Sequence, residues 1–417
     1  MGAGKPLVIV GASYAGVQLA ASARELGFEE RIVLIGDETH APYQRPPLSK
    51  GLLTGKTTVD KLALRGPDFF AQNNIELLLG RRATTLDAGA QTLALDDGGT
   101  LDYGWLALMT GARCRPFTLP GAALEGVLNL RTLDDALRVE AAAAALTATG
   151  QRACVIGGGF IGLEVAAALR SRGIEVTVIE AQPHLLTRSF PPAMSAYVEN
   201  AHRHRGIELL TGHAVRALHG EHGRVVAVEL EGGRRIDCGL VVLGIGVLPN
   251  TELAQQAGIA VENGIVVDML GRTSAPHVLA AGDVANMALP AAPGAAARMR
   301  LESIQAANDG ARAVASLLVG REQPCTAVPW FWSDQFELKF QMAGLPAHGD
   351  EVVLRGDMAS DRFSVFYLRQ GTLAAAHTVN KPAEHMQSRK LIGARVQLTA
   401  AELADESFDL KRVPLPV

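Results

Sequence analysis

The chain has 417 residues, which is enough for two or three domains with a large core, and its formal net charge is −4. A nearly neutral chain lacks the basic surface that nucleic-acid binding requires, and the sequence holds no apolar run of about 18 residues that could span a membrane. A predicted strand begins as early as Leu7, which is too early for a signal peptide. We therefore expect a cytoplasmic protein that binds neither nucleic acid nor membrane.

The first predicted strand ends in a glycine-rich turn, because residues 7–16 have the sequence LVIVGASYAG. Two templates match this stretch, each with one mismatch. One is the dinucleotide-binding turn G-x-G-x-x-G, in which Ser13 replaces the middle glycine. The other is the nucleophile elbow G-x-S-x-G of serine hydrolases, in which Ala15 replaces the last glycine. The stretch alone does not decide between a redox cofactor and a hydrolase.

A second stretch of the same design follows at residues 153–164, ACVIGGGFIGLE, and here the dinucleotide fingerprint is complete. The two turns align position by position: Gly11 with Gly157, Ser13 with Gly159, and Gly16 with Gly162. Each turn lies between a strand and a helix, and each helix leads to another strand, at residues 31–38 and 175–182. Two fingerprints in this context are strong evidence for two dinucleotide sites.

The fingerprint positions have distinct physical roles. The first glycine allows the tight turn, the second lets the backbone approach the pyrophosphate, and the third lets the helix pack on the strand. Ser13 adds a Cβ atom and a hydroxyl at the second position, which is tolerable if its φ is negative. A hydrolase elbow would need an acid and then a histidine in suitable settings downstream, and we find no such histidine. The repeat therefore favours dinucleotide binding.

Acidic residues at the ends of strands indicate which nucleotide each unit binds. Glu180 ends the second strand of the second unit, where an acid accepts hydrogen bonds from the adenosine ribose and repels a 2′-phosphate. No arginine follows directly, which favours NADH over NADPH, although Arg188 is a nearby cation. In the first unit Asp37 follows the matching position, either as a nucleotide ligand or as a turn residue. Asp283, in the stretch VLAAGDVA at 278–285, is suited to the ribityl hydroxyls of FAD.

Two further strands, at residues 106–112 and 240–250, end in small residues, as expected where the chain crosses between two nucleotide-binding domains. Together the motifs resemble the two-dinucleotide-binding-domain flavoproteins, and most closely their ferredoxin reductase group, which includes putidaredoxin reductase, rubredoxin reductase and the reductase components of aromatic-ring dioxygenases. Six stretches carry the resemblance: PYQRPPLSK (42–50), GGGFIGLE (157–164), GIGVLPN (244–250), AAGDVA (280–285), RLESIQAA (300–307) and VPWFWSDQ (328–335). Ser13 departs from the usual glycine.

The resemblance implies an α/β fold with two Rossmann-like dinucleotide-binding domains, for FAD and NAD, and a C-terminal α+β domain. The implied boundaries are 1–115 and 246–322 for the FAD domain, 116–245 for the NAD domain, and 323–417 for the C-terminal domain. The sequence itself agrees with the implied α+β character of the C-terminal domain. Residues 351–358 and 362–380 are predicted strands with a turn at Gln370 and Gly371, and residues 382–395 and 399–406 are predicted helices.

The segment 42–50 contains no cysteine, whereas relatives that reduce disulfides or peroxides carry one close to the flavin in this region. Electrons are therefore expected to leave the flavin directly. The four cysteines of the chain are widely separated, which excludes a C-x-x-C pair and iron–sulfur spacing and favours reduced, mostly buried thiols: Cys114, Cys154, Cys238 and Cys325. We predict no metal site.

The resemblance places Lys50 beside the isoalloxazine ring, where a cation stabilises negative charge on the reduced flavin. Glu164 is predicted to lie near the nicotinamide and to pair with Lys50; the alternative is a carboxylate that interacts with the helix dipole. Arg45 and Arg131 contact FAD phosphate or sugar oxygens by the same resemblance, or are surface arginines.

Aromatic and helical segments near the C-terminal end complete the predicted site. Residues 300–307 begin a helix whose N-terminus is expected to point at the flavin pyrimidine. Trp330 and Trp332 lie in a segment of alternating side chains, and we expect one to face the core and the other a cleft.

All predicted FAD contacts are Gly11, Ser13, Tyr14, Ala15, Gly16, Asp37, Arg45, Lys50, Ala83, Thr110, Gly111, Arg131, Gly282, Asp283, Ser303, Ile304 and Trp330. The predicted NAD contacts are Gly157, Gly159, Phe160, Ile161, Gly162, Glu164, Glu180, Arg188, Gly244, Ile245 and Gly246. The predicted catalytic residues are Lys50 and Glu164.

The resemblance implies an NADH-dependent ferredoxin reductase. A hydride passes from NADH to FAD, and single electrons pass on to a [2Fe-2S] ferredoxin that serves a cytochrome P450 or a ring-hydroxylating dioxygenase. The alternatives are a rubredoxin or quinone reductase of the same fold, or an NADH-binding redox signalling protein resembling apoptosis-inducing factor. We expect a monomer or a weak homodimer.

Four basic clusters are expected to be mostly solvated, and one of them is a candidate face for an acidic ferredoxin. They are Arg81-Arg82, His202 to Arg205, Arg234-Arg235 and Arg389-Lys390.

Overall fold

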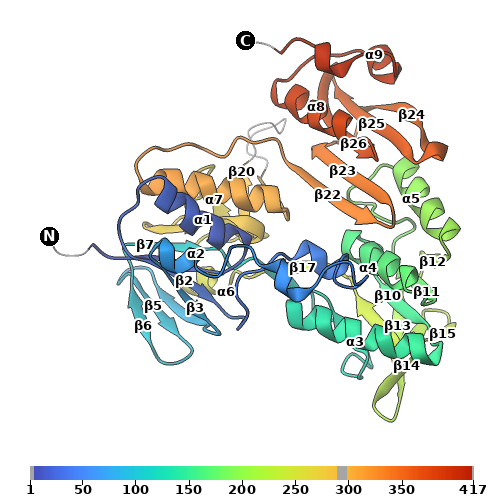
Figure 1. The fold of residues 1–417 in the computed structure, drawn as a ribbon, viewed down its shortest axis with the longest axis horizontal. Helices are drawn as coiled ribbons and strands as arrows, with labels where there is room; N and C mark the ends of the chain where they lie inside the picture. Colours follow the sequence, from blue (N-terminus) through green and yellow to red (C-terminus); the bar gives the residue numbers. More distant parts are fainter. Residues whose placement is uncertain (1–3, 289–297, 416–417) are drawn as a thin grey trace.

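The computed structural model describes residues 4–288 and 298–415 of the chain. Two sheets of parallel strands lie next to each other, and a third, antiparallel sheet lies above the second of them in the view of Figure 1. This arrangement confirms the predicted fold class, an α/β chain with two Rossmann-like parts and a C-terminal α+β part.

The first sheet is assembled from two segments that lie far apart in the sequence. Its parallel strands follow the order β19-β7-β1-β2-β3: β1 (Leu7–Val10), β2 (Ile32–Gly36), β3 (Ile75–Leu79), β7 (Trp105–Leu108) and β19 (Val278–Ala280). Helices α1 (Tyr14–Glu25) and α7 (Ile304–Leu318) pack together over one face (Figure 1). Strands β4 (Ala83–Asp87), β5 (Thr92–Leu95) and β6 (Thr100–Asp102) contribute to the core on the other face. Since both faces are covered, the strands are continuous apolar runs.

The second sheet repeats this design with the order β12-β11-β10-β16-β9. Its strands are β9 (Val127–Asn129), β10 (Ala153–Ile156), β11 (Val176–Glu180), β12 (Ile207–Thr211) and β16 (Leu240–Leu243), and its helices are α3 (Leu133–Thr149), α4 (Phe160–Ser171) and α5 (Pro192–His204). Helix α3 begins with a capping box, in which Thr132 accepts from the backbone of Asp135 and the Asp135 side chain accepts from the backbone of Thr132. It ends at Gly150 in the left-handed region.

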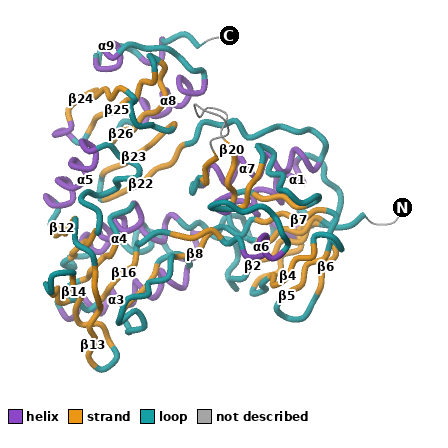
Figure 2. Tube along the Cα trace, turned by 180° about the vertical axis from the view of Figure 1, so that it is seen from behind, coloured by secondary structure: helices purple, strands orange, loops and turns teal. Residues whose placement is uncertain are grey.

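Two short strands connect these halves of the molecule. Strand β8 (Ala112–Cys114) pairs with β17 (Val247–Pro249) in antiparallel fashion, at the crossing that the small residues predicted. In Figure 2 β8 lies between the two parts. Smaller elements complete the core: α2 (Phe69–Gln72), α6 (Glu252–Gln256), the antiparallel strands β13 (Val215–Glu221), β14 (Arg224–Leu230) and β15 (Arg235–Asp237), and the sheet of β18 (Ile265–Val267), β20 (Ala285–Ala288) and β21 (Arg298–Arg300).

The C-terminal sheet is antiparallel, with the order β22-β23-β26-β25-β24. Its strands are β22 (Trp330–Gln335), β23 (Leu338–Gly344), β24 (Glu351–Asp357), β25 (Arg362–Arg369) and β26 (Thr372–Val379), followed by α8 (Pro382–Gly393) and α9 (Ala400–Ala404). The predicted strands, helices and turn are confirmed. Gln370 and Gly371 both have positive φ, of 52° and 77°, as the tight turn of a hairpin requires.

One apolar core joins the second sheet to the C-terminal sheet. Tyr197 on α5 meets Phe363 on β25 edge to face, with ring centroids 4.7 Å apart. Phe160 on α4 meets Phe331 on β22 in the same way at 4.9 Å. Leu53, from the first part of the chain, belongs to the same buried cluster. Because apolar side chains of three parts share this core, the parts are expected to hold a fixed relative position.

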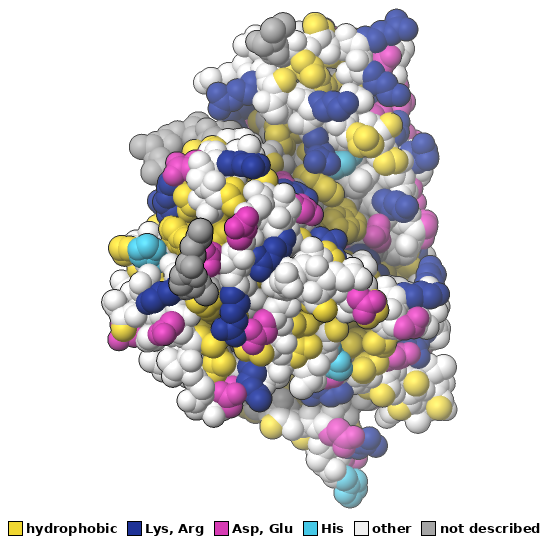
Figure 3. All heavy atoms as spheres, turned by 60° about the vertical axis from the view of Figure 1, so that its left-hand side comes forward, with side chains coloured by type: hydrophobic (Ala, Val, Ile, Leu, Met, Phe, Trp, Pro, Cys, Tyr) yellow, Lys and Arg dark blue, Asp and Glu magenta, His cyan; other side chains and the backbone are white. Residues whose placement is uncertain are grey.

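The predicted solvated cluster at residues 202–205 is wrong at two positions. His202 is fully buried beneath β22, and Arg205 forms ion pairs with Glu337 and Asp361 of the C-terminal part. Acidic and basic side chains are interspersed over the face shown in Figure 3. Within residues 4–288 and 298–415 no helix has the length and apolar character needed to cross a bilayer.

Arg355 is a buried cation on β24 that ties the last segment of the chain to the sheet. Its guanidinium donates to the backbone carbonyls of Leu403, Asp405, Glu406 and Phe408. Arg355→Met removes the hydrogen bonds that the guanidinium donates to these carbonyls, so we expect the free energy of unfolding to fall by about 3 kcal/mol. Arg362→Met, at an exposed position of β25, is the matched control. Equal losses of thermal stability in both variants would contradict the role of Arg355.

Candidate active site

Both glycine-rich turns open onto one cleft with a volume of about 1730 Å³. It runs from the ends of the first sheet's strands to those of the second, and Phe331 and Trp332 of the C-terminal part complete its lining. Most of the predicted nucleotide contacts line this cleft. The exceptions are Gly16, Ala83, Gly162 and Trp330.

The first turn meets the steric demands of a dinucleotide site. Gly11 has a φ of +120°, and a Cβ there would lie 2.1 Å from the Met109 carbonyl oxygen. A Cβ on Gly16 would lie 1.9 Å from the Gly11 carbonyl oxygen, so this glycine lets α1 pack on the turn. Ser13 has a φ of −121°, and this negative value allows a side chain at the second position of the turn. Its hydroxyl does not cap α1. The first amides of α1 are therefore free to bind an anion.

The second turn contains two glycines that the fold requires and a third, Gly159, that it does not. A Cβ on Gly157 would lie 2.4 Å from the Gly244 carbonyl oxygen, and one on Gly162 would lie 2.2 Å from the Gly157 carbonyl oxygen. Gly159 has a φ of −84°, and a Cβ there would meet no protein atom within 4 Å. The space beside Gly159 is open at the N-terminus of α4, which fits a pyrophosphate.

Glu180 lies at the end of β11 and lines the cleft, as predicted. Its Oε2 accepts a hydrogen bond from the Gly158 amide at 2.7 Å, and its Oε1 accepts one from the Gln182 amide at 2.8 Å. These contacts hold the carboxylate beside the second turn. Arg188 lines the same part of the cleft, on the loop between β11 and α5.

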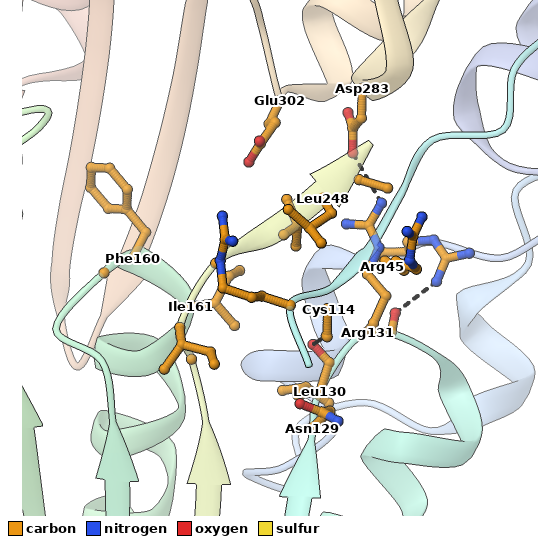
Figure 4. Close-up of a pocket in the computed structure, with 18 of the residues that line it drawn as sticks. Arg45, Cys114, Asn129, Leu130, Arg131, Phe160, Ile161, Leu248, Asp283 and Glu302 are labelled. Atoms are coloured by element: carbon orange, nitrogen blue, oxygen red, sulfur yellow. Dashed lines mark hydrogen bonds and ion pairs between the residues drawn. The ribbon is translucent and has the colours of Figure 1, made fainter. Parts of the chain in front are cut away.

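A cluster of arginines and acids lines the cleft near the first turn (Figure 4). Arg131 donates to Asp283 at 3.0 Å, and Arg45 donates to Glu38 at 2.6 Å and to the Arg131 carbonyl oxygen at 2.7 Å. Arg45 also lies 3.4 Å from the Ser13 hydroxyl. The two arginines are thus partly buried cleft residues, held by acids beside the N-terminus of α1.

Sequence reasoning missed two members of this cluster, Glu38 and Tyr43. Tyr43 donates to Glu38 and accepts from the Leu133 amide, and burial raises the pKa of its hydroxyl. Burial lowers the pKa of Arg45, but Tyr43 and Glu38 outweigh this effect and raise it overall. Glu38 follows Asp37 directly in the sequence, and this acidic pair was the available signal. Asp37 lines the cleft but is more exposed and pairs with Arg82 at 3.2 Å.

Tyr14 and Cys114 also line the cleft. Burial raises the pKa of the Tyr14 hydroxyl to about 12, against the opposing effect of Arg45. Cys114 was not predicted here, and burial raises the pKa of its thiol as well. Since the thiolate is the reactive form, this shift disfavours Cys114 as a nucleophile. All four cysteines are free thiols, and the other three are buried.

The structure brings Lys50 and Glu164 together. Lys50 Nζ lies 2.7 Å from Glu164 Oε2, and the Glu164 side chain is only 2% exposed. Lys50 follows a short 3-10 helix, η1 (Pro46–Ser49), whereas Glu164 lies beyond the first turn of α4. The alternative of a carboxylate that interacts with the helix dipole is therefore wrong, because that interaction is confined to the first turn and Glu164 lies beyond it. Ser49 and Ser333 also donate to Glu164, at 2.5 Å and 2.6 Å.

Trp330 and Trp332 lie on the same face of β22 rather than facing core and cleft from opposite sides. Their rings stack with centroids 5.7 Å apart, because side chains two residues apart in a strand point the same way. Trp332 lines the cleft. Trp330 lies farther out, against α8, with the Arg389 guanidinium 4.4 Å from its ring centroid. The prediction that one tryptophan faces the core and the other a cleft is therefore wrong, because the alternation of a strand puts residues 330 and 332 on one face.

Comparison with known proteins agrees with this geometry. Residues 5–311 match the family model described as pyridine nucleotide-disulphide oxidoreductase, and residues 330–414 match the one described as reductase C-terminal. The chain is 42% identical to rhodocoxin reductase of Rhodococcus erythropolis, over 97% of this chain and 93% of that protein. It is 40% identical to putidaredoxin reductase CamA of Pseudomonas putida, over 99% of this chain and 97% of that protein.

Solved structures show the same likeness. The crystal structure of the ferredoxin reductase for the CYP199A2 system from Rhodopseudomonas palustris superimposes with a TM-score of 0.93 at 40% identity, covering 98% of this chain and 99% of that one. The covalent putidaredoxin reductase–putidaredoxin complex gives a TM-score of 0.92 at 39% identity, covering 98% of each chain. Fold and site thus define a flavoprotein that takes electrons from a nicotinamide nucleotide. The chain belongs to the pyridine nucleotide-disulphide oxidoreductase family, and within it to the ferredoxin reductases of P450 and dioxygenase systems.

The contrast between Gly159 and Gly162 gives a test of the second site. Gly159→Ala places a methyl group in open space, so we expect unchanged thermal stability but about tenfold weaker binding of NADH, as measured by titration. Gly162→Ala instead forces a clash with the Gly157 carbonyl oxygen, and we expect a lower melting temperature. If Gly159→Ala binds NADH as tightly as the unchanged protein, the pyrophosphate does not lie at this turn.

Proposed function

We propose that this chain carries electrons from NADH, through FAD held in the cleft, to a [2Fe-2S] ferredoxin that serves a cytochrome P450 or a ring-hydroxylating dioxygenase. The opening of two dinucleotide turns onto one cleft carries the proposal, because it brings donor and acceptor nucleotides together. Segment 42–50 has no cysteine, and burial raises the pKa of the Cys114 thiol in the cleft. Both observations support electron transfer without a thiol intermediate.

We assign FAD to the domain formed by residues 1–115 and 246–322, and NADH to residues 116–245. Strand β19 supports the first assignment, since it completes the sheet of the N-terminal segment. Residues 323–417 form the third domain. Residues 1–3, 289–297 and 416–417 fall within these boundaries but outside the described part of the chain.

FAD, when bound, supplies the conversion of one hydride into two single electrons, which amino-acid side chains cannot perform. The chain supplies the positions and the charges. The free amides at the start of α1 and the guanidinium groups of Arg45 and Arg131 are suited to the pyrophosphate and sugar. The N-terminus of α7, with Ser303 accepting from the Ala306 amide, directs its partial positive charge into the cleft. Lys50 supplies a full positive charge, and Glu164 fixes its position.

The carboxylate of Glu180 supports a preference for NADH. It lines the cleft at the end of β11, and its negative charge disfavours the 2′-phosphate of NADPH at that point. Arg188 acts in the opposite direction, so the preference depends on which of the two side chains lies nearer the ribose. We further propose a cytoplasmic monomer or weak homodimer.

Steady-state oxidation of NADH and NADPH with purified [2Fe-2S] ferredoxins, rubredoxins and quinones tests this function. We expect a ferredoxin-dependent rate, with a kcat/KM for NADH at least about tenfold above that for NADPH. Turnover only with rubredoxin or quinones would assign the chain to a different reductase of this fold. Slow turnover with every acceptor, together with a long-lived complex of reduced flavin and NAD, would favour a signalling role.

Glu164→Gln removes the negative charge that holds Lys50 but keeps the shape of the side chain. We expect the limiting rate of flavin reduction by NADH, followed by stopped-flow absorbance, to fall by about tenfold to a hundredfold. Glu125→Gln, at an exposed ion pair with Arg224, is the control and should leave the rate unchanged. An unaltered rate in Glu164→Gln would exclude the ion pair from hydride transfer.

A further inference from the structure

Besides its ion pair with Lys50, Glu164 is the end point of a buried hydrogen-bond chain. Ser333 Oγ donates to Glu164 Oε1 at 2.6 Å, and Gln335 Nε2 donates to Ser333 Oγ at 3.1 Å. Gln335 Oε1 in turn lies 2.8 Å from His202 Nε2. All four residues are at most 3% exposed. We call Ser333, Gln335 and His202 the donor chain.

The donor chain has a single direction. An amide oxygen can only accept, so the Nε2 atom of His202 carries a hydrogen. Within the described residues His202 Nδ1 is buried without a hydrogen-bond partner, and burial lowers the pKa of the imidazole to about 4. The imidazole is therefore neutral at pH 7, and Nδ1 carries no hydrogen. Each group donates toward Glu164, and aligned hydrogen bonds of this kind polarise one another.

The residues of the donor chain lie on two elements outside both glycine-rich turns. Ser333 and Gln335 lie on β22 of the C-terminal part, and His202 lies on α5. Ser333 and Gln335 point away from the face that carries Trp330 and Trp332, because side chains alternate along the strand. One face of β22 thus contributes Trp332 to the cleft, and the other contributes Phe331 to the cleft and donors to Glu164.

The Glu164 carboxylate has too few donors without Ser333. Oε2 binds Lys50 and Ser49, whereas the one donor found for Oε1 among the described residues is Ser333. A buried carboxylate oxygen without a donor is costly, so loss of Ser333 would let the carboxylate rotate. Rotation would remove the fixed anion beside Lys50.

We propose that Ser333, Gln335 and His202 are positioning residues, which hold the Glu164 carboxylate in the orientation that binds Lys50. This inference rests on the proposed role of the Lys50–Glu164 pair in hydride transfer. Ser333, Gln335 and His202 do not line the cleft, whereas Glu164 does, so the donor chain acts through Glu164.

Single-turnover reduction of the holoenzyme by NADH tests the inference. We expect Ser333→Ala and Gln335→Met each to lower the limiting rate by about tenfold, with an unchanged dissociation constant for NADH. In the Glu164→Gln background the same substitutions should cause no further loss, because the donor chain then has no anion to hold. Additive losses in the double variants would overturn the inference.

Ser364→Ala is the matched control, since Ser364 on β25 donates to Glu384 at 2.5 Å and is likewise buried. We expect it to lower thermal stability without slowing flavin reduction. If Ser364→Ala slowed flavin reduction equally, the slowing would be a general effect of lost stability, and the inference would be overturned.

The imidazole ¹⁵N resonances of His202 provide a readout that does not depend on activity. We expect a neutral ring protonated at Nε2 in the unchanged protein, and loss of this tautomer preference in Gln335→Met. A ring protonated at Nδ1 would overturn the donor chain.

If Glu164→Gln slows the reaction and the Ser333 and Gln335 variants do not, the inference fails while the proposed function stands. If Glu164→Gln has no effect, the role of the ion pair fails as well.

Discussion

The buried carboxylate of Glu164 is the constraint on which the site depends. A charged side chain that is only 2% exposed is stable only when donors surround it. Glu164 and its donors come from three separate parts of the chain. Ser49 and Lys50 belong to the N-terminal part, Glu164 to the second, and Ser333 to the C-terminal part. The ion pair therefore exists only in the assembled molecule. The apolar core shared by α4, α5 and the C-terminal sheet supplies the burial that makes the pairing necessary.

Much of the fold was predictable because the determining contacts are local. A parallel strand covered on both faces must be apolar throughout, so β1 and β10 are visible as short apolar runs. The third glycine of each turn is fixed by the carbonyl oxygen of the first glycine of the same turn. The hairpin at Gln370 and Gly371 likewise depends on the conformation of two residues. Local sequence carries all of this information.

The partners within the site were harder to predict, because they lie far apart in the sequence. Ser333 is 169 residues from Glu164, and no spacing rule relates them. Other errors had a usable signal. His202 was placed in a solvated basic cluster, yet Met194, Val198 and His202 recur every four residues along α5 and share its buried face. Charge composition suggested exposure, whereas helical periodicity indicates burial, which the structure has.

Strand β22 shows how one element can serve two parts of a site. Side chains alternate along the strand, so Trp330 and Trp332 share one face, whereas Ser333 and Gln335 share the other. A shift of one residue would exchange the two faces and place an indole against Glu164. The pairing of Ser333 with Phe340 and of Gln335 with Leu338 on β23 prevents this shift, since Phe340 and Leu338 are themselves anchored in the shared core. The register of a single edge strand therefore fixes both the aromatic lining of the cleft and the environment of its buried carboxylate.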